Sequence, residues 1–169
     1  DTQTPQGIVA VIQKEEVGLP DLRRGKFLFL EDVQDPGNVG TMIRTADAAG
    51  FTGVIVSDKS ADIYSLKTLR SMQGSHFHLP IYRMSLASFV EEAKKSNLSI
   101  LATTLSKESK DYRELSPLEN FALVMGNEGQ GISSVMAESA DQLVHIGMKG
   151  RAESLNVAVA AGILMFYFS

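Results

Sequence analysis

Short apolar runs alternate with helical patterns along most of the chain. The runs that predict β-strands are Gly7–Ile12, Phe27–Leu30, Gly53–Val56, Leu98–Thr103, Ala122–Met125 and Leu143–Ile146. The segments that predict helices lie between most of them, at Val39–Ala49, Ser65–Met72, Leu86–Lys95, Ser133–Ala140 and Leu155–Phe168. This alternation is typical of an α/β fold with a mostly parallel sheet and helices on both faces. Ligands bind such sheets where strands end and loops lead into helices, and three of these junctions have unusual sequences.

The first junction, D-P-G-N-V-G-T-M-I-R over residues 35–44, follows the predicted strand Phe27–Leu30. Asn38 is expected to cap the helix, and Gly50 is expected to end it. The apolar face of this helix carries Val39, Met42, Ile43, Ala46 and Ala49. Arg44 lies nearly opposite that face, which leaves two interpretations open. It is either a surface arginine paired with Asp47, or a group that binds an anion together with the free amides of the helix start.

The second junction, G-N-E-G-Q-G over residues 126–131, joins the predicted strand Ala122–Met125 to a helix. Three closely spaced glycines allow the backbone to approach a ligand and to adopt positive φ, although a tight turn would also explain them. The spacing differs from the dinucleotide fingerprint G-x-G-x-x-G, and the lysine and serine or threonine of a P-loop are missing. The junction therefore supports neither NAD nor ATP binding.

The third junction, I-G-M-K-G-R-A-E-S-L-N over residues 146–156, leads from a strand into the last helix, with Ser154 as its expected cap. From Leu155 to Phe168 this helix is apolar on nearly every side. We therefore expect its own domain and a partner subunit to cover it. Asn156 is its only strongly polar group. A buried amide needs hydrogen-bond partners, so Asn156 is either a structural link or a ligand contact.

Composition narrows the classes of function. The chain has 169 residues, which suits one domain, and its formal net charge of −4 argues against binding nucleic acid by bulk charge alone. The absence of cysteine excludes disulfides, zinc–thiolate sites and cysteine nucleophiles. No apolar run is long enough for a membrane span, so a cytoplasmic protein is expected. Three histidines without clustered carboxylates favour structural roles over a metal site.

The polar segment Ser106–Glu114 predicts a surface loop in which basic and acidic side chains offset one another. Two groups of basic residues stand out elsewhere. Lys67 and Arg70 share one helix face, and Arg23, Arg24 and Lys26 form the second group. Such side chains are usually solvated, although either group could contact RNA phosphates.

Together, the three junctions resemble the signature motifs of the SpoU (TrmH) family of RNA ribose methyltransferases, in the SPOUT superfamily. The matches are Asn38-x-Gly40-x-x-x-Arg44-x-Ala46, Met125-Gly126-Asn127-Glu128-Gly129-x-Gly131 and Ile146-x-Met148-x-Gly150-x-x-x-Ser154-Leu155-Asn156-Val157-Ala158-Val159-Ala160. Their order and separation agree with the family, and the resemblance covers essentially the whole chain. One departure is Gly147, where members of the family commonly carry proline.

The resemblance implies a C-terminal trefoil knot that holds S-adenosylmethionine through backbone groups of the second and third motifs. The residues implied to line this pocket are Thr103, Gly126, Ile146, Met148 and Leu155. It also implies an obligate homodimer in which Arg44 reaches the cofactor of the neighbouring subunit. Residues 7–169 would be the catalytic domain, and the linker-like residues 1–6 fit a preceding RNA-binding domain.

The implied activity is methyl transfer to a ribose 2′-OH in ribosomal or transfer RNA, without a metal and without DNA as substrate. The residues implied to act in catalysis are Arg44, Asn38, Glu128, Ser154 and Asn156. The family proposal makes Arg44 the base, but a guanidinium holds its proton strongly at neutral pH. Arg44 is therefore either perturbed by burial, or it fixes the 3′-phosphate while the proton passes to water. The other four are expected to orient the substrate and Arg44.

Two alternatives remain open from the sequence. One is a non-catalytic knotted module that binds RNA or assists ribosome assembly, although such a module would be free to lose Arg44, Glu128, Ser154 and Asn156. The other is a flavodoxin-like nucleotide or signalling domain, which fits the alternation of strands and helices but leaves the three glycine-bearing junctions unexplained.

Overall fold

The computed structural model of the chain describes residues 7, 11, 13 and 17–169. The expected linker over residues 1–6 lies outside the described residues, and so does most of the expected strand Gly7–Ile12. The fold is therefore described from residue 17 onward.

A seven-stranded sheet forms the centre of the molecule, in the order β3-β2-β1-β6-β4-β7-β5. The strands are β1 (Lys26–Leu30), β2 (Gly53–Val56), β3 (Ile81–Arg83), β4 (Ser99–Thr103), β5 (Lys110–Asp111), β6 (Phe121–Met125) and β7 (Gln142–His145). Every pairing between these strands is parallel, which confirms the predicted sheet type.

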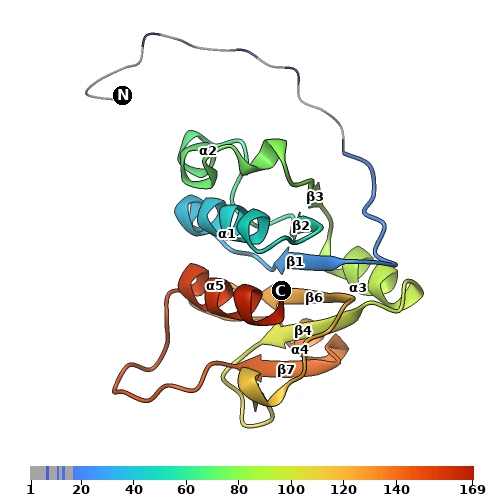
Figure 1. Ribbon diagram of the computed structural model, residues 1–169, viewed down its shortest axis with the longest axis vertical. Helices are drawn as coiled ribbons and strands as arrows, with labels where there is room; N and C mark the ends of the chain where they lie inside the picture. Colours follow the sequence, from blue (N-terminus) through green and yellow to red (C-terminus); the bar gives the residue numbers. More distant parts are fainter. Residues whose placement is uncertain (1–6, 8–10, 12, 14–16) are drawn as a thin grey trace.

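Helices cover both faces of the sheet, as predicted. One face carries α1 (Pro36–Ala48), α2 (Leu66–Met72) and α5 (Val157–Phe168), with α1 in the middle (Figure 1). The other face carries α3 (Leu86–Lys95) and α4 (Ser134–Ser139). Short 3₁₀ turns, η1 (Ser75–Phe77) and η2 (Tyr112–Glu114), complete the described secondary structure.

The central strands are buried on both sides. In β1, Leu28 and Leu30 belong to the core beneath α1 and α5, whereas Phe27 and Phe29 belong to the core beneath α3 and α4. Successive side chains of a strand point to opposite faces, so a strand covered on both faces needs an unbroken apolar run. This is the physical reason why continuous apolar segments identified the strands.

Two strands escaped the sequence analysis because they are short edge strands. β3 has three residues and β5 has two, and β5 lies inside the polar segment that was expected to be a surface loop. Each edge strand pairs on one side only, so neither needs a long apolar run.

The structure corrects two predicted helix caps. Asp35 caps α1, because its carboxylate accepts a hydrogen bond from the Asn38 amide at 2.9 Å and Pro36 takes the first helical position. Asn156, not Ser154, caps α5. The predicted helix end at Gly50 is confirmed by a φ of +71° directly after the C-cap residue Ala49. None of the described helices combines the length and apolar content needed to cross a membrane.

Candidate active site

A pocket of about 500 Å³ opens at the carboxyl ends of β4, β6 and β7. Its walls are the loops that follow these strands and the start of α5. The structure brings all five predicted cofactor-binding residues to this pocket, namely Thr103, Gly126, Ile146, Met148 and Leu155. Two of the three glycine-bearing junctions therefore converge on one cavity, and the Thr103 loop forms its third wall.

The glycine-bearing loop of the second junction folds back on itself. Asn127 and Gly131 exchange two backbone hydrogen bonds, at 3.0 and 2.9 Å. The side-chain oxygen of Asn127 accepts further hydrogen bonds from the amides of Gly129 and Gln130. A Cβ atom on Gly126 would collide with the backbone of Gly131 and Ile132, so only glycine fits there. The loop presents a compact strip of backbone to the pocket.

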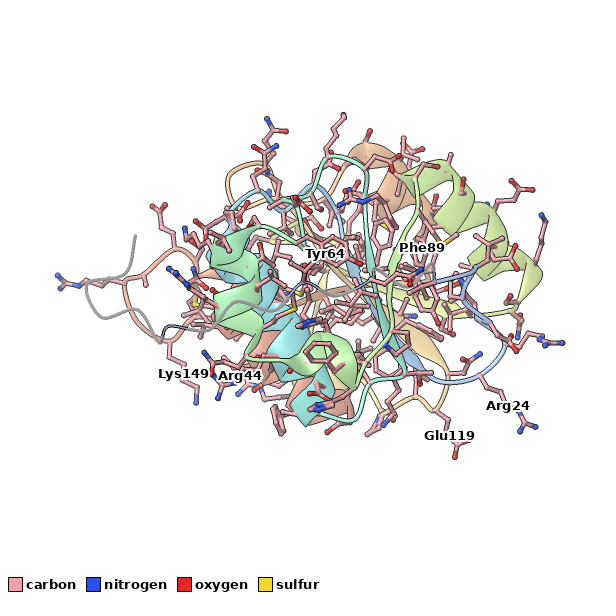
Figure 2. All side chains as sticks on the ribbon, turned by 90° about the horizontal axis from the view of Figure 1, so that it is seen from above. Arg24, Arg44, Tyr64, Phe89, Glu119 and Lys149 are labelled. Atoms are coloured by element: carbon pink, nitrogen blue, oxygen red, sulfur yellow. The ribbon has the colours of Figure 1, made fainter. Side chains whose placement is uncertain are left out.

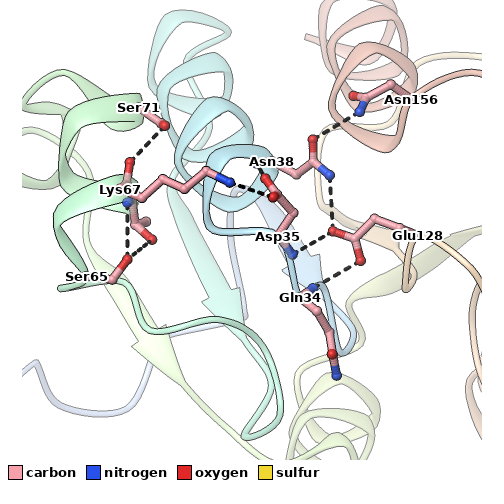
Figure 3. Close-up of polar contacts among 9 residues, drawn as sticks. Gln34, Asp35, Asn38, Ser65, Lys67, Ser71, Glu128 and Asn156 are labelled. Carbon is pink, nitrogen blue, oxygen red and sulfur yellow. Dashed lines mark hydrogen bonds and ion pairs between the residues drawn. The ribbon is translucent and has the colours of Figure 1, made fainter.

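A polar cluster joins the three junctions beside the pocket (Figure 3). The Glu128 carboxylate accepts hydrogen bonds from the amides of Gln34 and Asp35 at 3.0 and 2.9 Å. It also accepts one from the Asn38 side-chain amide at 3.1 Å. Asn156 donates to the Asn38 side-chain oxygen at 3.1 Å. Asn38, Glu128 and Asn156, one residue from each motif, thus form a chain of hydrogen bonds. Asn38 is 90 residues from Glu128 and 118 residues from Asn156 in the sequence.

These hydrogen bonds determine the direction in which the pKa of Glu128 is shifted. Partial burial works to raise its pKa, but the hydrogen bonds from Gln34, Asp35 and Asn38 outweigh that effect and lower the pKa overall. The carboxylate is consequently ionised at neutral pH and carries a negative charge at the pocket wall.

Asn156 is a structural link. Its side-chain oxygen accepts hydrogen bonds from the amides of Ala158 and Val159, which caps α5, while its amide group bonds to Asn38. The residue is exposed in the single chain, so the burial considered from the sequence is absent there. Ser154 lines the pocket and is exposed.

Arg44 differs from the other predicted catalytic residues. It lies six residues beyond Asn38 on α1, about 9 Å along the helix axis, and belongs neither to the pocket lining nor to the cluster. Glu128 and Ser154 line the pocket, whereas Asn38 and Asn156 are part of the cluster beside it.

Of the two interpretations left open by the sequence, the pairing of Arg44 with Asp47 does not form, and Asp47 bonds to His78 at 3.2 Å instead. Within the described residues, no hydrogen bond or ion pair engages the Arg44 side chain, which is exposed (Figure 2).

Sequence reasoning missed two residues that support the cluster. Asp35 caps α1 through Asn38 and also forms a 2.7 Å ion pair with Lys67 of α2. The Lys67 ammonium, together with the Asn38 amide, lowers the pKa of the Asp35 carboxyl. The Asp-Pro pair at the helix start was the available signal, since aspartate before a first-turn proline is a common helix cap.

The third-junction glycine at position 147 has a specific packing role. A Cβ atom there would lie 2.7 Å from a carboxylate oxygen of Asp111 in β5. Arg113 holds that carboxylate through a 2.7 Å ion pair and lowers the pKa of Asp111. At this position, glycine lets the loop approach β5 closely.

Two of the histidines have hydrogen-bond partners. His78 bonds to Asp47, and His145, which lines the pocket, bonds to Ser109 at 2.9 Å. The His76 ring lies 4.0 Å from the Phe77 ring at a tilt of 37°, and its buried Nδ1 atom has no hydrogen-bond partner among the described residues. In the part of the chain that the structure describes, no group of three or more His, Cys, Asp or Glu side chains is placed to hold a metal ion.

Comparisons with known proteins agree on one family. The model of the SpoU rRNA Methylase family matches residues 25–166. The chain is 47% identical to the 23S rRNA (guanosine(2553)-2′-O)-methyltransferase RlmP of Bacillus subtilis, over 99% of this chain and 66% of RlmP.

Solved structures give the same result. An AdoMet-bound rRNA methyltransferase from Sinorhizobium meliloti is 41% identical, with a TM-score of 0.80 over 83% of this chain and 54% of that chain. The SpoU methyltransferase AviRb from Streptomyces viridochromogenes is 32% identical, with a TM-score of 0.75 over 83% and 56%. The chain thus spans between about half and two thirds of the length of these proteins.

Proposed function

The chain belongs to the SpoU rRNA Methylase family, and we propose that it transfers a methyl group from S-adenosylmethionine to a ribose 2′-OH of RNA. Ribosomal RNA is the favoured substrate and transfer RNA the second, because RlmP is named for 23S rRNA. One observation carries the proposal. The five residues that the resemblance assigns to the cofactor line one pocket, and Asn38, Glu128 and Asn156 form one hydrogen-bonded cluster beside it.

The pocket suits S-adenosylmethionine in size and chemistry. Its volume of about 500 Å³ falls within the range of small-molecule sites. Apolar side chains such as Ile146, Met148 and Leu155 offer a surface for the adenine ring. The ionised Glu128 carboxylate complements a ligand that carries positive charge. When bound, the cofactor supplies a methyl group made electrophilic by the sulfonium sulfur.

The residues of the chain then have to position the ribose hydroxyl and remove its proton. We assign the shape of the site to the Asn38–Glu128–Asn156 cluster, which fixes the second-junction loop against the start of α1. We assign Ser154 to orienting the substrate, and its exposed position at the pocket wall supports this role. Arg44 is unburied in the single chain, so the structure favours a role in binding the 3′-phosphate, with the proton passing to water.

We further propose that two copies of the chain form the active enzyme. Leu155 and, on α5, Val159, Ile163 and Phe166 present a row of apolar side chains that are 38%, 53%, 37% and 59% exposed. Their spacing of three to four residues places them on one helix face, which a second copy would bury. Arg44 of one copy would then reach the pocket of its partner, which accounts for its absence from its own pocket.

The sheet topology supports the proposed C-terminal knot. β6 lies between β1 and β4, β7 lies between β4 and β5, and the chain then returns from β7 to pack α5 on α1. An rRNA substrate also implies the cytoplasmic location that the sequence predicts.

Methyl transfer tests the proposal. The chain is incubated with tritiated S-adenosylmethionine and an unmodified 23S rRNA transcript, and the RNA is digested to nucleosides. We expect the label in a 2′-O-methylated nucleoside. Labelled bases would contradict the proposed reaction.

The alternative of a non-catalytic RNA-binding module makes a different prediction in the same experiment. Such a module would bind the transcript but leave it unlabelled, and 16S rRNA and total tRNA, tested in parallel reactions, would stay unlabelled as well. Retained S-adenosylmethionine binding without transfer to any of them would favour this alternative.

A further inference from the structure

We propose that the outer surface of α1 and α2 binds the phosphodiester backbone of the RNA beside the target nucleotide. The surface is a basic strip formed by Arg44, Lys67 and Arg70. The inference rests on the proposed function for its ligand class, but its test measures RNA binding separately from methyl transfer.

The two helices of the basic strip pack closely side by side (Figure 1). A Cβ atom on Gly40 would lie 2.5 Å from the Ser71 side chain and 2.6 Å from the Thr68 carbonyl oxygen. One turn earlier, a Cβ atom on Gly37 would lie 3.4 Å from the Lys67 side chain. The absence of side chains at these glycines therefore brings α2, with Lys67, next to α1.

Helical geometry places Arg44 on the open surface between α2 and α5. Gly40 faces α2, whereas Thr45 approaches Gly162 of α5. At about 100° per residue, Arg44 projects about 40° from the direction of Gly40 and about 100° from that of Thr45. Arg44 is exposed, and Figure 2 shows its side chain projecting outward from the ribbon.

The charge on the strip is only partly offset. Lys67 is paired with Asp35, and Asp47, the acid on the same turn of α1 as Arg44, is paired with His78. In the part of the chain that the structure describes, no hydrogen bond or ion pair engages the side chains of Arg44 and Arg70. Two guanidinium groups are thus free to bind phosphates, which they recognise through paired N–H donors.

An exposed aromatic ring lies beside the far end of α1. Phe77 of η1 is 69% exposed, and its neighbour His78 bonds to Asp47 in the last turn of α1. Stacking of bases on exposed aromatic rings is a common way to hold single-stranded RNA without reading its sequence. Phe77 therefore extends the strip with a surface for an unpaired base.

The position of the strip suits a strand that leaves the active site. Lys67 contacts Asp35, whose backbone amide bonds to Glu128 at the pocket wall. From Asp35 to Asp47 the distance along α1 is about 18 Å, which spans several nucleotides of extended RNA. A second copy of this chain is a poorer occupant of the α2 part of the strip, because free charges are depleted in interface cores and the apolar row on α5 is better suited to that contact. Arg44, which would reach the pocket of the partner copy, lies at the border between the two surfaces.

Salt-dependent RNA binding tests this proposal. Arg70→Gln removes one free charge, and Lys94→Gln on α3 removes one exposed charge from the opposite face of the sheet. Binding of the unmodified 23S rRNA transcript and of an oligouridylate is measured at increasing KCl. We expect Arg70→Gln to weaken both by about fivefold and to reduce the salt slope by about 0.7 to 1. Lys94→Gln should match the wild type.

Phe77→Ala provides a second test, since the ring is 69% exposed and its removal should leave the buried core unchanged. We expect it to weaken oligouridylate binding with an unchanged salt slope, because stacking releases no counterions. S-adenosylmethionine affinity should remain unchanged in both strip variants.

Equal RNA affinity and salt slope in Arg70→Gln and Lys94→Gln would overturn the proposal. A change from dimer to monomer in Arg70→Gln, seen by sedimentation, would overturn it as well and assign the strip to the contact between copies. If the strip variants bind RNA more weakly but the wild type transfers no methyl group, the result would support RNA binding by the strip and contradict the proposed reaction.

Discussion

The two ends of α1 carry polar residues of one motif in opposite surroundings. Asn38, in the first turn, bonds to both Glu128 and Asn156, and all three motifs meet there. Arg44, in the second half of the helix, is exposed and has no partner among the described residues. Polar groups that hold a structure need protein partners, whereas a group that binds a substrate has to keep its donors available. The comparison supports the proposal that Asn38 shapes the site and that Arg44 binds the RNA.

The largest expected effect is on the rate of methyl transfer when the unpaired Arg44 side chain is removed. Arg44→Ala is expected to reduce the rate of methyl transfer to 23S rRNA by at least about 100-fold, because a positioning contact to the substrate is lost. The unfolding free energy should change by less than about 0.5 kcal/mol, since the side chain is exposed. Single-turnover kinetics and urea unfolding measure the two effects. A wild-type rate would remove Arg44 from the reaction.

For the hydrogen-bonded Asn38–Glu128–Asn156 cluster, we expect a substitution to lower the stability of the fold. Glu128→Gln places an amide where a carboxylate now accepts three hydrogen bonds. We expect a loss of about 1–2 kcal/mol in unfolding free energy, measured by urea unfolding. Glu138→Gln on α4 is the matched control, because that glutamate is also exposed but, among the described residues, its carboxylate accepts no hydrogen bond. Equal stability of the two variants would show that the cluster does not hold the loops.

A smaller effect distinguishes the observed cap of α5 from the predicted one. Asn156→Ala removes the side chain that accepts hydrogen bonds from two amides of the first turn, which should cost about 1 kcal/mol. Ser154→Ala removes an exposed hydroxyl and should cost less than about 0.5 kcal/mol. Thermal and urea unfolding of both variants measure the difference. A larger loss for Ser154→Ala would restore it as the cap.

The smallest predicted effect is a dependence on pH. The pKa of Glu128 is lowered in the folded state, so its stabilising contribution is present at neutral pH and is lost as the pH falls below the ordinary carboxyl value of 4.5. The stability difference between the wild type and Glu128→Gln should therefore shrink on acidification through that range. Urea unfolding at neutral and acidic pH measures this change, and a constant difference would argue against an ionised Glu128.

The sequence predicted the elements whose apolar patterns are long. β1, β6 and α5 are buried over most of their length or on several sides, and their patterns are unambiguous for that reason. Strand order predicted only that ligands bind where the parallel strands end. The five residues expected to line the pocket came from the resemblance to the SpoU family, and all five lie at it.

The remaining features depend on contacts between segments far apart in the chain. Asp47 bonds to His78, 31 residues away, rather than to Arg44. Asp35 and Lys67 are 32 residues apart. Local spacing suggests the nearest partner, whereas packing of α1 against α2 and η1 decides which partner is within reach. Caps were misassigned for a related reason, because several residues near each helix start had suitable side chains.

The most direct test of this account is calorimetric titration of S-adenosylmethionine into the wild type, Arg44→Ala and Glu128→Gln. The account predicts that Arg44→Ala binds the cofactor within twofold of the wild-type affinity, and that Glu128→Gln binds it at least about fivefold more weakly. Loss of binding in Arg44→Ala together with wild-type binding in Glu128→Gln would contradict the division between a group that faces the RNA and a cluster that shapes the pocket.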